Sequence, residues 1–205
     1  MKFISKQGNL SPYPFIRVDN FHYVAGSTFP REGQTQGIFV LTHMHSDHLG
    51  GLTRNWQPAL DWNYGVIYCS EATYNMMLLR FQNLKPFLRP VPLNTWTDLP
   101  VREYVRKDLV QKMEEARGSS GNGDKYQGIK YEQSPLAPHL LLRPSATLRN
   151  LRLCFLDANH CPGAVMVRID GPLGQVLHTG DFRFGGERMV QEVRDSCQDL
   201  AHRPL

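Results

Sequence analysis

The six residues 43–48, with the sequence HMHSDH, carry the strongest chemical signal in this chain. His43 and His45 alternate at the end of an apolar run, so their imidazoles can converge on one side. Asp47 and His48 follow after a turn and can reach a second point nearby. Imidazole nitrogens and carboxylate oxygens bind zinc at about 2.0–2.2 Å. By composition, the pattern would arise by chance on the order of once in a thousand such chains. We therefore expect a site for one metal ion or two neighbouring ions rather than a histidine-rich surface turn.

Further ligands for such a site must come from elsewhere in the chain, and two residues stand out. His160 lies in the loop DANHCPG, directly after an apolar segment. Asp181 ends the segment QVLHTGD, where Gly180 permits an unusual backbone angle. A third acid, Asp19 in VDNF, is expected to be buried and to brace the metal loop by hydrogen bonds.

The elements that position these residues are mostly short apolar runs typical of buried strands. A helix over 71–81 is expected after Ser70, which can cap it, and a second helix from Pro100 to Gly118. Residues 1–14 suggest a loosely held lead-in, and 118–135 a flexible insertion. The strands expected are 15–21, 37–41, 65–69, 139–143, 151–157, 164–170 and 175–182, with a hairpin turn at 171–174 joining the last two. Their close succession predicts an α/β fold with a substantial antiparallel component.

Composition sets the outer limits. The chain has 205 residues, of which 41% are hydrophobic, so it can bury a core and is not wholly disordered. No window approaches the ~18 apolar residues of a membrane span, and the start has no sustained apolar segment of the kind that a signal peptide needs. The net charge of +4 is compatible with a polyanionic partner. The four cysteines form no CxxC pair, which favours free thiols in a reducing compartment.

The motifs together resemble the metallo-β-lactamase superfamily. Five segments carry the resemblance: VDNF (18–21), FVLTHMHSDHLGGL (39–52), IYCS (67–70), LDANHCPGAVM (156–166) and LHTGDFR (177–183). The first histidine motif is general to the superfamily. The last two segments are similar to the DNA cross-link repair nucleases of its β-CASP branch. The resemblance implies an αβ/βα sandwich, of which the chain would hold only the N-terminal half, within residues 15–205 and without the β-CASP cap domain.

The resemblance also implies roles for the candidate residues. His43, His45 and His160 would hold one zinc ion tightly, Asp47 and His48 would face a position for a second, and Asp181 would bridge the two. Asp19 would support the metal loop without binding a metal. The implied activity is hydrolysis of DNA from a 5′ end, in cross-link or double-strand-break repair in the nucleus. Metal-bound hydroxide would attack phosphorus, with Asp47 or Asp181 holding the water and accepting its proton.

Two alternatives stay open at this point. The chain could be another hydrolase of the same superfamily, such as an RNA nuclease or an esterase. Alternatively, it could be an inactive metal-binding fragment, because the later histidine and acid motifs of the family have no match before Leu205.

Overall fold

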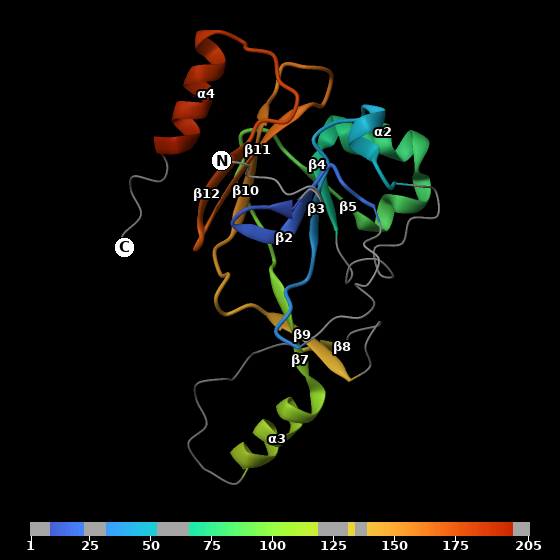
Figure 1. Ribbon diagram of the computed structural model, residues 1–205, viewed down its shortest axis with the longest axis vertical. Coiled ribbons are helices and arrows are strands. Elements are labelled where there is room, and N and C mark those ends of the chain that lie inside the picture. Colours follow the sequence, from blue (N-terminus) through green and yellow to red (C-terminus); the bar gives the residue numbers. More distant parts are fainter. Residues whose placement is uncertain (1–8, 23–31, 53–65, 119–130, 134–138, 199–205) are drawn as a thin grey trace.

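The structure, a computed structural model, describes residues 9–22, 32–52, 66–118, 131–133 and 139–198. Two β-sheets and the helices beside them form the body of the molecule, and a smaller lobe extends from it along the long axis (Figure 1). The sheets contain both parallel and antiparallel strand pairs. The expected α/β class is therefore confirmed at this level. None of the helices in the described residues has the length and apolar character that a membrane crossing needs.

The first sheet has five strands in the order β1-β2-β3-β4-β5. β2 to β5 run parallel and β1 is antiparallel to β2. Because β2 and β3 are parallel neighbours, the residues that follow them emerge at one edge of the sheet. Its strands are β1 (Asn9–Leu10), β2 (Tyr13–Val18), β3 (Ile38–Val40), β4 (Ile67–Ser70) and β5 (Leu88–Val91).

The second sheet is antiparallel, with four strands in the order β12-β11-β10-β6. β11 and β12 form the expected hairpin, in which Gly171 pairs with Gly174. β12 ends at His178, so Asp181 lies in the loop beyond it. The strands are β6 (Thr97–Asp98), β10 (Arg152–Asp157), β11 (Val165–Gly171) and β12 (Gly174–His178).

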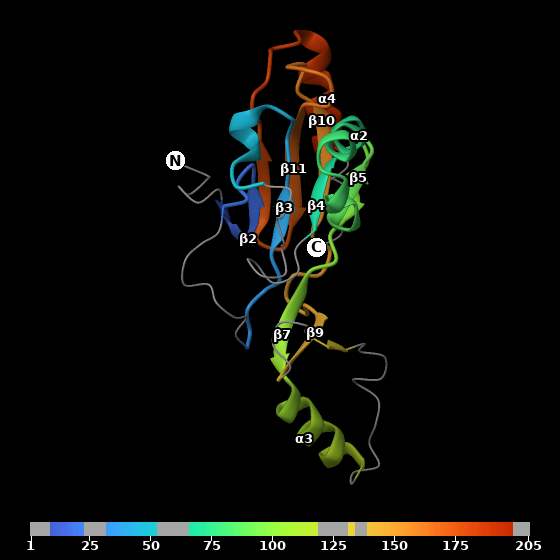
Figure 2. The same cartoon turned by 90° about the vertical axis from the view of Figure 1, so that its right-hand side faces the viewer.

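Side chains that alternate along the strands place the two sheets face to face. In β3, Ile38 and Val40 join a buried cluster that also contains Phe155 and Val167 of the second sheet. Phe39, between them, points the other way, into a cluster with helix α2 (Glu71–Arg80). Figure 2 shows α2 beside β4 and β5. As predicted, Ser70 caps this helix, with its side chain accepting a hydrogen bond from the Thr73 backbone.

Helix α4 (Glu187–Gln198), which the sequence analysis did not predict, packs against one end of the outer face of the second sheet (Figure 1). Cys154 of β10 and Met166 of β11 point to this face and pack with Met189 of α4. The two sheets therefore face each other, with α2 packed outside the first sheet and α4 against part of the outer face of the second. Two 3₁₀ segments, η1 (Ser46–Leu49) and η2 (Gln82–Phe87), lie in the connections.

The lobe consists of a three-stranded antiparallel sheet, in the order β7-β9-β8, and helix α3, which projects beyond it (Figure 2). The expected single helix from Pro100 to Gly118 is wrong in its first part, because residues 102–106 form a strand. Tyr104 is 1% exposed and packs with Leu140 and Leu142, so pairing with β9 overrides helix formation there. The elements are β7 (Arg102–Arg106), α3 (Lys107–Gly118), β8 (Glu132–Gln133) and β9 (Leu140–Pro144).

The expected loose lead-in (1–14) and flexible insertion (118–135) compare differently with the structure. Within the expected lead-in, Leu10 and Tyr13 are fully buried, and the Tyr13 hydroxyl donates to the Gly174 carbonyl at 2.6 Å. The core therefore begins inside that segment, and residues 1–8 lie outside the described part. Most of the expected insertion at 118–135 also lies outside it, apart from β8, where Glu132 forms an ion pair with Arg102.

Candidate metal centre

Three loops from the two facing sheets meet at one edge of the body. The loop after β3 carries residues 43–48, the loop between β10 and β11 carries His160, and the segment after β12 carries Asp181. Backbone hydrogen bonds tie them together. The Val165 amide donates to the Thr42 carbonyl at 3.1 Å, and the Arg183 amide donates to the Ala158 carbonyl at 2.9 Å. The loops are thus fixed relative to one another before any ligand is bound.

Asp19, directly after β2, is the centre of the hydrogen bonds that support the site. Its carboxylate accepts from the Thr42 amide at 2.7 Å, from the Thr42 hydroxyl at 2.6 Å and from His48 Nδ1 at 2.7 Å. Its side chain is only 11% exposed, and its backbone has a φ of +51°. This backbone angle is rare for a residue other than glycine, and such strain is found where the surroundings enforce it.

This network also decides which ring nitrogen of His43 and of His48 is free to bind a metal. The Thr42 hydroxyl gives its proton to Asp19, so it can only accept from His43 Nδ1, 3.0 Å away. His43 Nε2 then keeps its lone pair and points into the cluster. In the same way, His48 donates through Nδ1 and keeps Nε2 free. Carboxylates and hydroxyls beside histidine ligands commonly set the tautomer in this way.

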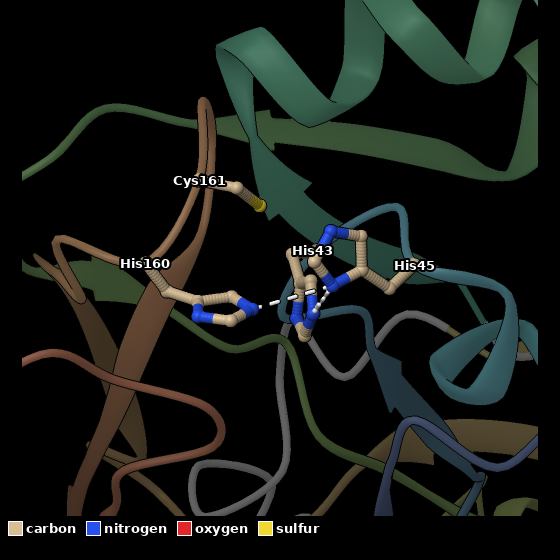
Figure 3. Close-up of side chains that lie close together, drawn as sticks. All are labelled: His43, His45, His160 and Cys161. Atoms are coloured by element: carbon tan, nitrogen blue, oxygen red, sulfur yellow. Dashed lines mark hydrogen bonds between the residues drawn. The ribbon is translucent and has the colours of Figure 1, made fainter.

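His43, His45 and His160 converge on one point, although they come from two distant parts of the sequence (Figure 3). His43 Nε2 lies 3.0 Å from His45 Nδ1, which in turn lies 3.3 Å from His160 Nε2. Ligands about 2.0–2.1 Å from a tetrahedral zinc ion are separated by roughly 3.3 Å. These nitrogen spacings therefore suit three ligands of one ion.

Asp181 lies between this group and His48. Its Oδ2 is 3.7 Å from His160 Nε2 and 3.5 Å from His48 Nε2. His43, His48 and Asp181 accordingly form a second group whose ligand atoms could share a metal ion. Asp47 lies at the rim, with a side chain 76% exposed and Oδ2 3.6 Å from His48 Nε2. The structure thus brings all six predicted ligands to one edge, with Asp47 the most peripheral.

The electrostatic setting differs between the rings of His43 and His48. Burial, together with the neighbouring His48 ring, lowers the pKa of His43, which is fully buried. The hydrogen bond to Asp19 raises the pKa of His48. A metal binds the neutral form of imidazole. His43 is therefore held in the form that a ligand requires.

Two glycines of the metal loops have positive φ angles. Gly51, at the end of the first loop, lies close to the chain after β2. A Cβ at Gly51, where φ is +89°, would lie 2.3 Å from the His22 amide nitrogen. Gly180 does have the unusual angle expected before Asp181, with a φ of +54°.

Two residues at the site were not predicted for it. Thr42 links Asp19 to His43, and its sequence gives no signal because its partner is 23 residues away. Cys161 was grouped with the free thiols, yet its sulfur joins the three histidine nitrogens in a group whose ligand atoms lie within 4.8 Å of one another. In the sequence, its position next to the predicted ligand His160 was the feature that could have indicated this.

These donors fit a divalent metal ion. Thr42 and Asp19 orient the rings of His43 and His48. The spacing of the first three histidine nitrogens suits tetrahedral ligation, and a carboxylate lies between the two groups. Imidazole and carboxylate donors suit zinc among other transition metals. The structure thus holds clusters that could bind a metal, as expected.

The amino-acid sequence is similar to those of several known proteins. The chain is 28% identical to 5′ exonuclease Apollo of Danio rerio over 147 residues, which is 72% of this chain. It is 28% identical to the human DNA cross-link repair 1A protein over 81% of this chain. It is 24% identical to the DNA cross-link repair protein PSO2/SNM1 of Saccharomyces cerevisiae over 93% of it. The chain is thus similar in sequence to DNA cross-link repair proteins over most of its length.

The predicted resemblance to this group is therefore confirmed. The chain spans 17%, 10% and 22% of the length of these three relatives, respectively. No protein-family profile matches the chain. The cross-link repair homologues thus align with most of this chain, whereas it covers a small part of each of them.

Proposed function

We propose that this chain carries the metal site of a DNA nuclease that hydrolyses phosphodiester bonds from a 5′ end in cross-link or double-strand-break repair. One observation carries the proposal: Asp181 Oδ2 lies between His160 Nε2 and His48 Nε2, in a homologue of a 5′ exonuclease. A carboxylate shared between two histidine groups suits two neighbouring metal positions. We propose a nuclear localisation, since chromosomal DNA is repaired in the nucleus.

The proposed fold is the αβ/βα sandwich of the metallo-β-lactamases, over residues 15–205. Two sheets packed together support it, with α2 outside the first sheet and α4 against part of the outer face of the second. The loops that carry ligands leave both sheets at a shared edge, where a substrate could reach them.

Zinc is the proposed metal, held by His43, His45 and His160, with a second position at Asp47, His48 and Asp181. When bound, zinc lowers the pKa of a coordinated water to about 7 and offsets charge on phosphoryl oxygens. Asp181 is 48% exposed and Asp47 76% exposed, so either carboxylate can meet a water molecule and accept its proton. Asp19 and Thr42 hold the two histidine rings in place throughout.

The surface next to Asp181 supports a nucleic acid as substrate. Phe182 is 46% exposed and Phe184 is 71% exposed, both in the segment that follows the bridging acid. Exposed aromatic rings stack on the bases of single strands, each stack contributing about 1–3 kcal/mol. The net charge of +4 is also favourable toward a polyanion. An unpaired 5′ end is therefore the form of DNA that we propose enters the site.

The proposal is tested by offering three substrates to the purified, zinc-loaded chain. These are a 5′-phosphorylated DNA strand, an RNA strand of the same sequence and a thioester. We expect cleavage of DNA, lost on chelation and in His45→Ala, and kept in the matched surface variant Asp98→Asn. Preference for RNA or the thioester would replace the nuclease assignment with another hydrolase. Zinc binding without cleavage of any substrate would leave a metal-binding fragment.

A further inference from the structure

We infer that Cys161 is a metal ligand, its sulfur completing a set of three nitrogens and one sulfur with His43, His45 and His160. The inference rests on the metal site proposed above and adds to it a donor that determines which metals bind. Three features carry it: the position of the thiol, its lack of a covalent partner and the bonding geometry of thiolate with zinc.

The position of Cys161 is fixed by the loop that also carries His160. The Cys161 carbonyl accepts from the Ala164 amide at 3.0 Å, which closes the turn and holds the Cys161 backbone in place. In Figure 3 its sulfur points toward the rings of His43 and His45. One ligand atom from each of the four residues lies within 4.8 Å of the others.

The thiol is free to bind. Cys161 is partly exposed and forms no disulfide, whereas Cys69 and Cys154 are buried in the body and lie outside the cluster. Among the described residues, no other cysteine joins a group that could hold a metal ion. A soft sulfur donor at this position is thus a feature of this loop and not of the cysteines in general.

The geometry requires only a small adjustment. Zinc binds thiolate at about 2.3 Å and imidazole at about 2.0–2.1 Å, so tetrahedral sulfur and nitrogen ligands are roughly 3.6 Å apart. An upper spacing of 4.8 Å is therefore about an ångström too wide, a distance within the reach of a rotation about the Cα–Cβ bond. On binding, the thiol proton passes to solvent and a sulfur–metal bond forms, with no change of oxidation state.

The consequence is selectivity for the metal. Thiolate favours zinc, cobalt and cadmium over magnesium and manganese, which prefer oxygen ligands. With Cys161 bound, four protein ligands would fill a tetrahedral site. Cys161 and the bridging Asp181 would therefore compete for the fourth position of this ion.

The test uses the purified chain loaded with Co²⁺, comparing Cys161→Ala with Cys154→Ala as the matched control. We expect a near-ultraviolet thiolate-to-cobalt band in the wild type and in Cys154→Ala, and its loss in Cys161→Ala. Zinc affinity, measured by competition with a chromophoric chelator, should fall about tenfold or more in Cys161→Ala alone. Circular dichroism establishes that both variants are folded.

The outcomes separate this inference from the proposed function. If the wild type binds no cobalt or zinc, the metal site itself is wrong. If it binds either metal without the thiolate band, and Cys161→Ala binds zinc equally well, the metal site stands and the role of Cys161 is overturned. Zinc should also slow alkylation of Cys161 by iodoacetamide, read from its peptide by mass spectrometry, and an unchanged rate would count against ligation.

Discussion

Asp19 illustrates how much of the site depends on a residue that binds no metal in our proposal. One carboxylate fixes the backbone of Thr42, the hydroxyl of Thr42 and the ring of His48. Through Thr42 it also reaches His43. A backbone in the left-handed region costs about 1–3 kcal/mol for a residue other than glycine. The three hydrogen bonds offset that cost and orient two histidines at once.

Replacing Asp19 with Asn should therefore weaken the metal site without removing a ligand. The amide keeps the shape, but its NH₂ group would face either the Thr42 amide or the His48 Nδ1–H, both of which are donors. We expect zinc affinity to fall about 10–100-fold, measured by chelator competition. Asp98→Asn, at an exposed acid of β6, is the control and should change nothing. Unchanged affinity in Asp19→Asn would mean that the histidines are oriented without this carboxylate.

Cys69 supplies a prediction about pH. Burial in β4 raises the pKa of its thiol from 9.0 to about 12. The pKa of the thiol is higher in the folded state than in the unfolded state, so the folded state holds the protonated thiol more tightly. Its contribution to the free energy of unfolding is fully present below pH 9 and is lost as the pH rises from 9 toward 12. We expect no alkylation of Cys69 in the native chain at pH 8 and rapid reaction in urea, read by peptide mass spectrometry. Rapid native labelling at pH 8 would contradict its burial.

The residues of the site could be predicted from the sequence to the extent that their signal is local. His43, His45 and His48 lie within six residues, and such a cluster is informative without knowledge of the fold. His160 and Asp181 could be named because each follows an apolar strand. Thr42 could not be, because its role depends on a carboxylate that only the parallel pairing of β2 and β3 brings to it.

At the scale of elements, the loop that carries His160 is fastened to the start of α2. The Gly163 carbonyl accepts from the Ser70 hydroxyl at 2.7 Å and from the Thr73 hydroxyl at 3.1 Å. Ser70 thereby both caps the helix and holds the loop. Gly163 has a φ of +82°, and a Cβ there would lie 2.8 Å from Thr73 Oγ1.

Gly163→Ala should consequently destabilise the protein and displace the loop. Positive φ and the contact with Thr73 both act against a methyl group, and we expect a loss of about 1–3 kcal/mol in urea unfolding. Zinc affinity should fall as well, since His160 is three residues away. Gly174→Ala is the control, because its φ is +114° but no atom lies within 4 Å of the added Cβ. Equal zinc affinities in the two variants would argue against a link between this loop and the metal.

The segment between β12 and α4 should contribute to DNA binding through Phe184. Removing its ring in Phe184→Ala should weaken the affinity for single-stranded DNA by about 1–3 kcal/mol, measured by fluorescence anisotropy. Leu109→Ala, at an exposed apolar residue of α3 in the lobe, should leave the affinity unchanged. A similar effect in both variants would indicate a general loss of apolar surface rather than stacking beside the site.

The two mispredicted elements have different causes. Residues 102–106 continue a helical pattern into α3, but Tyr104 is buried by Leu140 and Leu142 from a strand that lies far along the chain. There, tertiary packing overrides the local pattern. In α4, by contrast, Met189 and Val193 are four residues apart and so lie on one face of a helix, which packs near Cys154 and Met166. That helix could have been predicted from its spacing.

At the scale of the whole molecule, the candidate metal centre joins the two sheets. His43, His45 and His48 follow the first sheet, whereas His160 and Asp181 belong to loops of the second. The sheets also share a buried core that includes Val40 and Phe155. The convergence of these loops could not be deduced from their spacing, because it depends on how one sheet stacks on the other.

A metal that bridges the two sheets should stabilise the entire body, since the ligands come together only in the folded chain. Zinc at 100 times its Kd would add about 2.7 kcal/mol to the free energy of unfolding, which corresponds to a rise in Tm of roughly 5–10 °C for a chain of this size. Differential scanning fluorimetry with and without zinc measures the shift, and Mg²⁺ at the same concentration should give much less because its preferred ligands are oxygens. His43→Ala and His160→Ala remove ligands from opposite sheets, so each should abolish the shift. If His160→Ala kept the full shift, zinc would be held by the first sheet alone, and the two sheets would not be joined through the metal.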